Sequence, residues 1–203
     1  MAHSFLFKES ASQTAGPYVH IGCTPNFVGI SGVYAEDPGQ KMLSNRTKGE
    51  RIRIRGRVFD GANDIVKDGL IEIWQADAEG LYNSPDETRG APDPEFAGWG
   101  RQPTDLETGH FAFDTIKPGC VPVSDGRMQA PHISFWIVAR GINIGLSTRL
   151  YFADEPEANS ADPVLASIAD PTRRETLIAA REGDSYLFDI HLQGAQETVF
   201  FDV

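Results

Sequence analysis

Residues 51–59 read Arg51-Ile52-Arg53-Ile54-Arg55-Gly56-Arg57-Val58-Phe59, and this stretch decides the fold. Polar and apolar residues alternate along it. Because successive side chains of a strand point to opposite faces of a sheet, the pattern predicts a half-buried β-strand. Asp60-Gly61 follows directly, with the turn chemistry that ends such a strand.

Other short stretches with strand character follow the first one. They are residues 70–74, 110–114, 132–138, 148–152, 186–192 and 197–202, separated by Gly, Pro and Asp. Several short strands separated by such turn-forming residues predict an all-β fold, which we interpret as a β-sandwich of mixed topology. Only residues 171–181 have a helical period, and Thr172 followed by Glu175 resembles a capping box. We therefore expect one short helix near residues 172–181.

Two long segments, residues 16–50 and 75–109, have no regular pattern. Loops of this length are uncommon inside a compact domain and usually serve a function or an interface. Both contain aromatic residues, in which disordered chains are poor. We expect long ordered loops, and we expect residues 1–50 to pack as an arm on a partner chain. No linker divides the sequence, so residues 1–203 are predicted to form a single domain.

Composition narrows the possible partners and the compartment. The chain of 203 residues has a net charge of −11 and a pI near 4.8, which argues against nucleic acid. No apolar run is long enough to cross a bilayer, and the N-terminus lacks the basic lead of a signal peptide. Cys23 and Cys120 have no metal-type spacing and are interpreted as reduced thiols. We expect a cytoplasmic protein in which any anionic ligand needs a local cation.

The triplet His132-Ile133-Ser134 is the first candidate for chemistry. Alternate residues of a strand face the same side, so positions 132 and 134 point into one space. Two histidines placed in this way could share a metal ion, but the Ser134 hydroxyl is a poor ligand for Fe(III) or Zn(II). From the triplet alone, a core histidine with hydrogen-bonded ring nitrogens is the favoured interpretation.

Tyr82 and Arg140 are two further candidates, each with a structural alternative. Tyr82 lies beyond the end of strand 70–74, and since a phenol titrates near ~10 in water, only a strong Lewis acid holds it as phenolate at neutral pH. The alternative is a packed loop residue. Arg140 follows strand 132–138 and can bind a carboxylate or catecholate oxygen with two N–H groups, or else be solvated or structurally paired. Taken alone, these residues predict only a soluble all-β domain.

Longer motifs, in order along nearly the whole chain, carry more specific information. They are residues 12–22 (Ser-Gln-Thr-Ala-Gly-Pro-Tyr-Val-His-Ile-Gly), 71–77 (Ile-Glu-Ile-Trp-Gln-Ala-Asp), 116–119 (Ile-Lys-Pro-Gly), 130–133 (Ala-Pro-His-Ile), 140–144, 148–152, 173–177 and 198–202 (Thr-Val-Phe-Phe-Asp). In these motifs the sequence resembles the intradiol dioxygenases. The resemblance implies an enzyme subunit that takes part in O2-dependent cleavage of an aromatic ring.

The catalytic chains of this family bind non-haem Fe(III) through two tyrosines and two histidines. By resemblance, Tyr82 matches the first tyrosine and His132 the first histidine. Val121 and Ser134 stand where the second tyrosine and the second histidine belong. One phenolate and one imidazole do not hold a trivalent ion competitively. The resemblance therefore implies a chain without metal and without a catalytic residue of its own.

The resemblance also implies an alpha chain that pairs with an Fe(III)-bearing beta chain, in alpha–beta pairs of a larger hetero-oligomer. Thr14, Pro17 and Arg140 match alpha-chain positions that line the beta-chain pocket. The implied substrates are protocatechuate and O2, and the implied product is 3-carboxy-cis,cis-muconate. In this role Arg140 supplies positive charge, Thr14 a hydroxyl and Pro17 a rigid wall that limits the orientation of the ring.

Two other functions stay open from the sequence. One is a stand-alone β-sandwich binding module on a degenerate dioxygenase scaffold, which predicts a stable monomer. The other is an autonomous metalloenzyme, which needs a third ligand beside Tyr82 and His132, such as His110 or His20.

Overall fold

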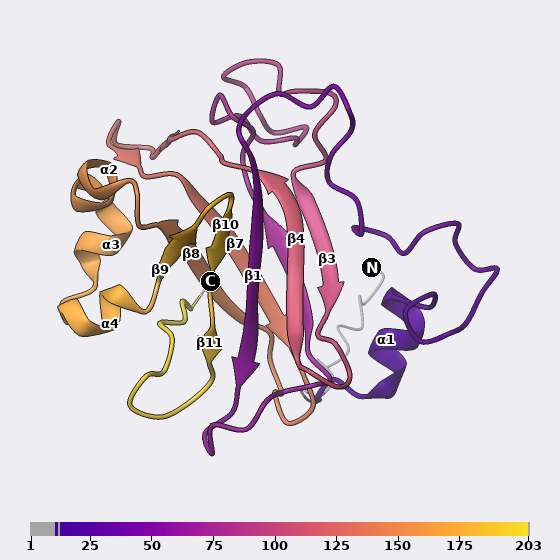
Figure 1. Ribbon diagram of the computed structural model, residues 1–203. Helices are drawn as coiled ribbons and strands as arrows, with labels where there is room; N and C mark the ends of the chain where they lie inside the picture. Colours follow the sequence, from indigo (N-terminus) through magenta and orange to yellow (C-terminus); the bar gives the residue numbers. More distant parts are fainter. Residues whose placement is uncertain (1–10, 12, 203) are drawn as a thin grey trace, which may run out of the picture.

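The computed structural model describes residue 11 and residues 13–202. The first part of the predicted 1–50 arm, residues 1–10 and 12, lies outside the described residues. Most of the regular structure is β, arranged in one strongly curved sheet with parallel and antiparallel neighbours (Figure 1). The prediction of an all-β, sandwich-like fold of mixed topology is confirmed.

The sheet has nine strands, and a short hairpin lies beside it. The strands are β1 (Arg51–Phe59), β2 (Leu70–Trp74), β3 (Trp99–Pro103), β4 (His110–Ile116), β5 (Val121–Pro122), β6 (Met128–Gln129), β7 (His132–Val138), β8 (Leu146–Phe152), β9 (Ile178–Glu182), β10 (Ser185–Leu187) and β11 (Ile190–His191). Their order is β11-β1-β10-β9-β8-β7-β2-β3, with β4 paired to β1, while β5 and β6 pair with each other.

Strand β1 has the alternation that its sequence predicts. Ile52, Ile54 and Val58 are buried, while the arginines between them reach the surface. It pairs antiparallel with β4 along its length and parallel with β10 and β11. In Figure 1, β1 and β4 lie in front of β7 and β8, and the main core fills the space between these two parts of the sheet. Phe113 and Phe135 meet there edge to face, with ring centroids 6.4 Å apart.

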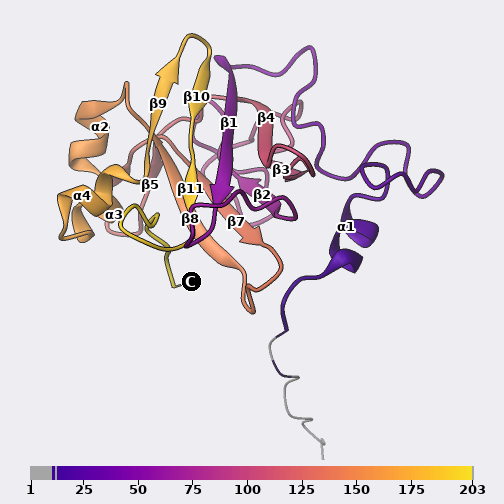
Figure 2. The same cartoon turned by 60° about the horizontal axis from the view of Figure 1, so that its bottom comes forward.

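The described residues form four short helices, where the sequence predicted one. They are α1 (Pro17–Cys23), α2 (Pro156–Ala161), α3 (Pro163–Ser167) and α4 (Pro171–Glu175). Each begins with proline, whose fixed φ suits the first helical turn. Figures 1 and 2 show α1 on one side of the sheet and the other three helices on the opposite side. Among the described residues, no helix has the length and apolarity to cross a membrane.

The predicted helix near residues 172–181 was wrong over its second half. Helix α4 ends at Glu175, and residues 178–182 form β9, which pairs parallel with β8. Pairing with β8 buries Ala179, so a long-range contact overrides the local helical period. The cap also differs from the prediction, because the Asp170 carboxylate accepts the Thr172 N–H at 2.8 Å.

A close approach of two backbones fixes glycine at position 56. A Cβ added to Gly56 would lie 1.9 Å from the Phe188 carbonyl oxygen, while the Phe188 N–H donates to the Arg55 carbonyl at 2.9 Å. We expect Gly56→Ala to lower the free energy of unfolding by about 3 kcal/mol, because it forces β1 away from residue 188. Urea denaturation measures this. Gly22→Ala, with no atom within 4 Å of the new Cβ, is the control and should change little. Equal stability of the two variants would contradict this account of Gly56.

Candidate functional site

The outer face of strands β2, β3, β7 and β8 carries the first candidate site. In β7 the odd-numbered residues Ile133, Phe135 and Ile137 enter the core, so His132, Ser134 and Trp136 face outward. Pairing sets Trp74 of β2 on one side of Ser134 and Arg149 of β8 on the other. The register therefore brings together a ring, a hydroxyl and a guanidinium that are far apart in sequence.

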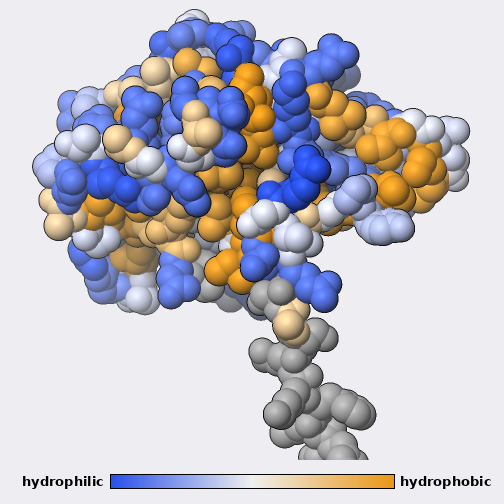
Figure 3. Space-filling model, turned by 90° about the horizontal axis from the view of Figure 1, so that it is seen from below, coloured by the Kyte–Doolittle hydropathy of each residue, from blue (hydrophilic) through white to orange (hydrophobic). Residues whose placement is uncertain are grey.

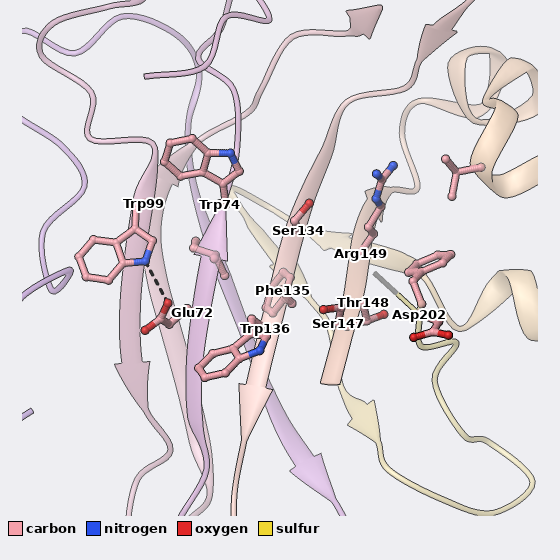
Figure 4. Close-up of a pocket in the computed structure, with 13 residues that line it drawn as sticks. Glu72, Trp74, Trp99, Ser134, Phe135, Trp136, Ser147, Thr148, Arg149 and Asp202 are labelled. Carbon is pink, nitrogen blue, oxygen red and sulfur yellow. Dashed lines mark hydrogen bonds between the residues drawn. The ribbon is translucent and has the colours of Figure 1, made fainter. Parts of the chain in front are cut away.

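These side chains line a pocket of about 400 Å³. Its walls are mainly apolar, and they include the rings of Trp74, Trp99, Trp136 and Phe201. In Figure 4, Ser134 stands between Trp74 and Arg149, and Trp136 lies farther along β7. The sequence holds three tryptophans, so all of them line this one pocket.

Tyr82 lies beside this pocket, placed by a turn that the buried Asp77 organises. The Asp77 carboxylate accepts the N–H groups of Glu79 and Leu81, each at 2.9 Å. The Tyr82 ring stacks on Trp74 with centroids 5.8 Å apart, and Tyr82 and Val121 line one adjoining hollow. The structure thus brings together, at the end of β2, the two positions that match the family's tyrosines, Tyr82 and Val121.

His132 is buried and held in one tautomer. Its Nδ1 lies 2.8 Å from the Ala130 carbonyl oxygen, which only accepts, so Nδ1 carries the proton. Burial, with a smaller contribution from the Arg149 charge, lowers the pKa of His132 to about 4. A backbone carbonyl that orients the far nitrogen is also the arrangement found for metal-binding histidines. His132 by itself therefore suits either a core residue or a ligand.

The guanidinium of Arg149 lies near enough to Tyr82 and to His132 for its charge to act on both. Its Nη1 donates to the Gln129 side-chain oxygen at 2.5 Å and approaches the Tyr151 hydroxyl at 3.4 Å. The Tyr151 ring lies 5.7 Å from that of His132. Burial raises the pKa of Tyr82, although the charge of Arg149 opposes this rise. One cation thus acts on both residues that match the family's iron ligands.

These donors do not fit Fe(III). Val121 offers no donor atom and Ser134 offers only a neutral hydroxyl, so two of the four positions lack the donor that Fe(III) needs. The charge of Arg149 acts on both Tyr82 and His132, and a fixed positive charge near these residues disfavours a metal cation. Within the described part of the chain, no three His, Cys, Asp or Glu side chains gather as a metal-binding group.

The three residues predicted to bind substrate lie together at a second pocket, on the side of α1. The Thr14 hydroxyl accepts the Gly141 N–H at 2.6 Å, which ties the segment before α1 to the end of β7. Pro17 and Arg140 line a pocket of about 450 Å³. The sequence placed these residues by resemblance only. The fold puts Pro17 and Arg140 in one pocket, and Thr14 lies beside it, bound to the residue after Arg140.

Arg140 has a partner that the sequence did not indicate. Its Nε lies 3.0 Å from an Asp68 carboxylate oxygen, and its side chain is 78% exposed. His20, on α1, is buried, and its Nε2 lies 3.1 Å from the Asp68 backbone oxygen. Its Nδ1 has no hydrogen-bond partner among the described residues. Spacing gave no sign of this cluster, because Asp68 lies in a loop far from both partners in sequence.

Comparison with known proteins supplies the family. The model of a family described as Dioxygenase matches residues 23–194, most of the chain. The chain belongs to the intradiol dioxygenase family. This family uses non-haem iron. The sequence is similar to chains named alpha and to a chain named beta.

Two sequence relatives and two solved structures illustrate this membership. The chain is 45% identical to the protocatechuate 3,4-dioxygenase alpha chain of Pseudomonas putida, over 97% of this chain and 98% of that one. It is 36% identical to the beta chain of the Burkholderia cepacia enzyme, over 74% and 67%. A dioxygenase domain from Streptomyces sp. SirexAA-E has a TM-score of 0.58 at 25% identity, over 92% and 100% of the chains. The fold is shared with 3-chlorocatechol 1,2-dioxygenase of Rhodococcus opacus 1CP, with a TM-score of 0.58 at 22% identity over 76% and 64%.

The lowered pKa of His132 predicts a pH-dependent stability. An unfolded histidine titrates near ~6.5, so the unfolded chain takes up this proton first as the pH falls. The contribution of neutral His132 is therefore complete above about pH 6.5, and it declines by about 3 kcal/mol as the pH falls towards 4. Urea unfolding at a series of pH values measures this. His132→Gln should flatten the dependence, while the exposed-site control His110→Gln should keep it. An unchanged slope in His132→Gln would show that His132 titrates normally.

Proposed function

We propose that this chain is the iron-free alpha subunit of a protocatechuate 3,4-dioxygenase. A beta chain holds Fe(III), and together the chains cleave protocatechuate with O2 to 3-carboxy-cis,cis-muconate in the cytoplasmic catabolism of aromatic compounds. The observation that carries the proposal is the ligand set around Tyr82 and His132, in which Val121 and Ser134 replace two donors. The 45% and 36% identity to alpha chains of two bacteria supports the same assignment.

The surface around α1 supports a partner contact. Ten large apolar residues of the described chain are exposed, and six of them lie between residues 18 and 34. They are Tyr18, Ile21, Phe27, Ile30, Val33 and Tyr34. Figure 3 shows apolar side chains gathered on the lobe that projects from the sheet on this side. Apolar patches of this kind mark protein–protein contacts, and we assign this one to the beta chain.

Thr14, Pro17 and Arg140 are proposed to border the beta-chain pocket where protocatechuate binds. The substrate is an anion, and a protein with a net charge of −11 repels it at long range. A local cation is therefore needed, and the exposed Arg140 can bind the carboxylate. Asp68 holds the guanidinium in place by an ion pair, and Thr14 fixes the backbone beside it. In this proposal the chain orients the ring, and residues 1–203 form one domain.

Metal analysis of the separated chains tests the division of roles. We expect the chain to copurify with its beta partner, with iron and the visible tyrosinate-to-iron absorption staying with the beta chain after separation. His132→Gln in this chain should leave the iron content of the complex unchanged. Stoichiometric iron in this chain alone, or loss of iron from the His132→Gln complex, would overturn the proposal.

Arg140→Ala tests the substrate role in the assembled complex. We expect KM for protocatechuate to rise roughly tenfold, because a charge-assisted hydrogen bond is lost, with the iron content unchanged. Steady-state kinetics and metal analysis measure the two quantities. Arg127→Ala removes an arginine that is likewise exposed and paired with an aspartate, Asp125, but lies outside this pocket, and it should leave KM unchanged. Flat kinetics in Arg140→Ala would remove Arg140 from the substrate site.

A further inference from the structure

We propose that the outer-face pocket around Arg149 is a binding site for a small aromatic carboxylate. This site is distinct from the second pocket, which Pro17 and Arg140 line beside α1. It does not depend on the proposed function. Near Tyr82 and His132, the two positions that by resemblance match iron ligands, this chain presents a cation of its own, Arg149. The pocket therefore favours an anion.

The charge of Arg149 is open to a ligand. Arg101, Arg140 and Arg181 each form an ion pair with a carboxylate. Arg149 instead donates to two neutral oxygens, those of Gln129 and Tyr151, both through Nη1. Among the described residues, no carboxylate lies within ion-pair distance of its guanidinium. A guanidinium with spare N–H groups is suited to the planar, two-oxygen face of a carboxylate.

The carboxylates nearby are already engaged or lie at the rim. Glu72 accepts the Arg101 Nε–H at 2.8 Å. The fully buried Asp162 accepts three backbone N–H groups at 2.8 Å and reaches Arg149 only through the Tyr151 hydroxyl. Asp202 is exposed at the edge of the pocket. Its charge disfavours a second negative group on the ligand, so a monocarboxylate fits better than a dicarboxylate.

The walls suit a flat ring attached to that carboxylate. Trp74 lies opposite Ser134 on the neighbouring strand, and Trp136 lies two residues farther along β7 (Figure 4). The pocket of about 400 Å³ has mainly apolar walls. The Phe201 ring lies 5.9 Å from the guanidinium carbon of Arg149. Aromatic walls gain from stacking with a ring as well as from burying it. Ser134, next to Arg149 in the register, offers a hydroxyl to the second carboxylate oxygen.

The chain carries its own reporter, because all three of its tryptophans line this pocket. Titration of the full chain with benzoate should change the tryptophan fluorescence in a saturable way. Benzamide has the same shape without the charge, and we expect it to bind at least about tenfold more weakly. Equal responses to benzoate and benzamide, or a response that does not saturate, would overturn the proposal.

Variants assign the binding to Arg149. Arg149→Gln should weaken benzoate binding about tenfold or more, Arg149→Lys should retain part of it, and Arg127→Gln should match the unchanged chain. Unweakened binding in Arg149→Gln overturns the proposal. If Arg149→Gln does not fold, the comparison of benzoate with benzamide on the unchanged chain still tests whether the pocket binds a carboxylate.

Equilibrium dialysis of the alpha–beta complex separates a free ligand from a partner side chain. The complex should bind one more benzoate per pair than the complex that carries Arg149→Gln, beyond any benzoate held at the iron. If the two complexes bind equal amounts, a group of the partner covers Arg149, and the site for a free acid is refuted.

Discussion

The pairing of β7 between β2 and β8 is the constraint on which the site depends. This register sends Ile133, Phe135 and Ile137 into the core and leaves His132 and Ser134 on the outer face. A slip of one residue would exchange the two faces, placing histidine in an apolar core and phenylalanine in the pocket. The buried aromatic contacts therefore fix the positions of the outer side chains as firmly as they fix the core.

Arg140 and Arg149 each provide a local positive charge at one pocket, but their surroundings differ. The net charge of −11 repels anions at a distance, so each pocket depends on a local cation. Arg140 is exposed and shares its charge with Asp68, which weakens it but fixes its direction. Arg149 is partly buried, and among the described residues it bonds only to neutral oxygens, so less of its charge is screened. The second arrangement is also what makes the Tyr82–His132 region unfavourable for a metal cation.

Local sequence patterns predicted the elements whose burial follows from alternation, and failed where distant pairing decides. Strands 51–59, 70–74 and 132–138 match the structure, and in 51–59 the alternation that predicted the strand is a property of the strand itself. The helix predicted near 172–181 ends at Glu175 because the following residues form β9, which pairs with β8. Strand β3 was not predicted, because its residues lie in a segment interpreted as a loop and become a strand by pairing with β2. Tyr82 and His132 were found by motif, whereas the role of Arg149 needed the β7–β8 register, which sequence spacing does not contain.

The two pockets also differ in the contacts that fix their shape, and this difference affects whether each can bind a ligand without a partner chain. The outer-face pocket stands mainly on four paired strands, so its geometry is set by the fold of this chain. The α1 pocket is held by single links such as Thr14 to Gly141 and His20 to Asp68, and it borders the apolar residues 18–34. Few links and an uncovered apolar surface mean low local stability. A partner that covers this surface would therefore supply the order that the substrate site needs, whereas the Arg149 pocket can bind without such help.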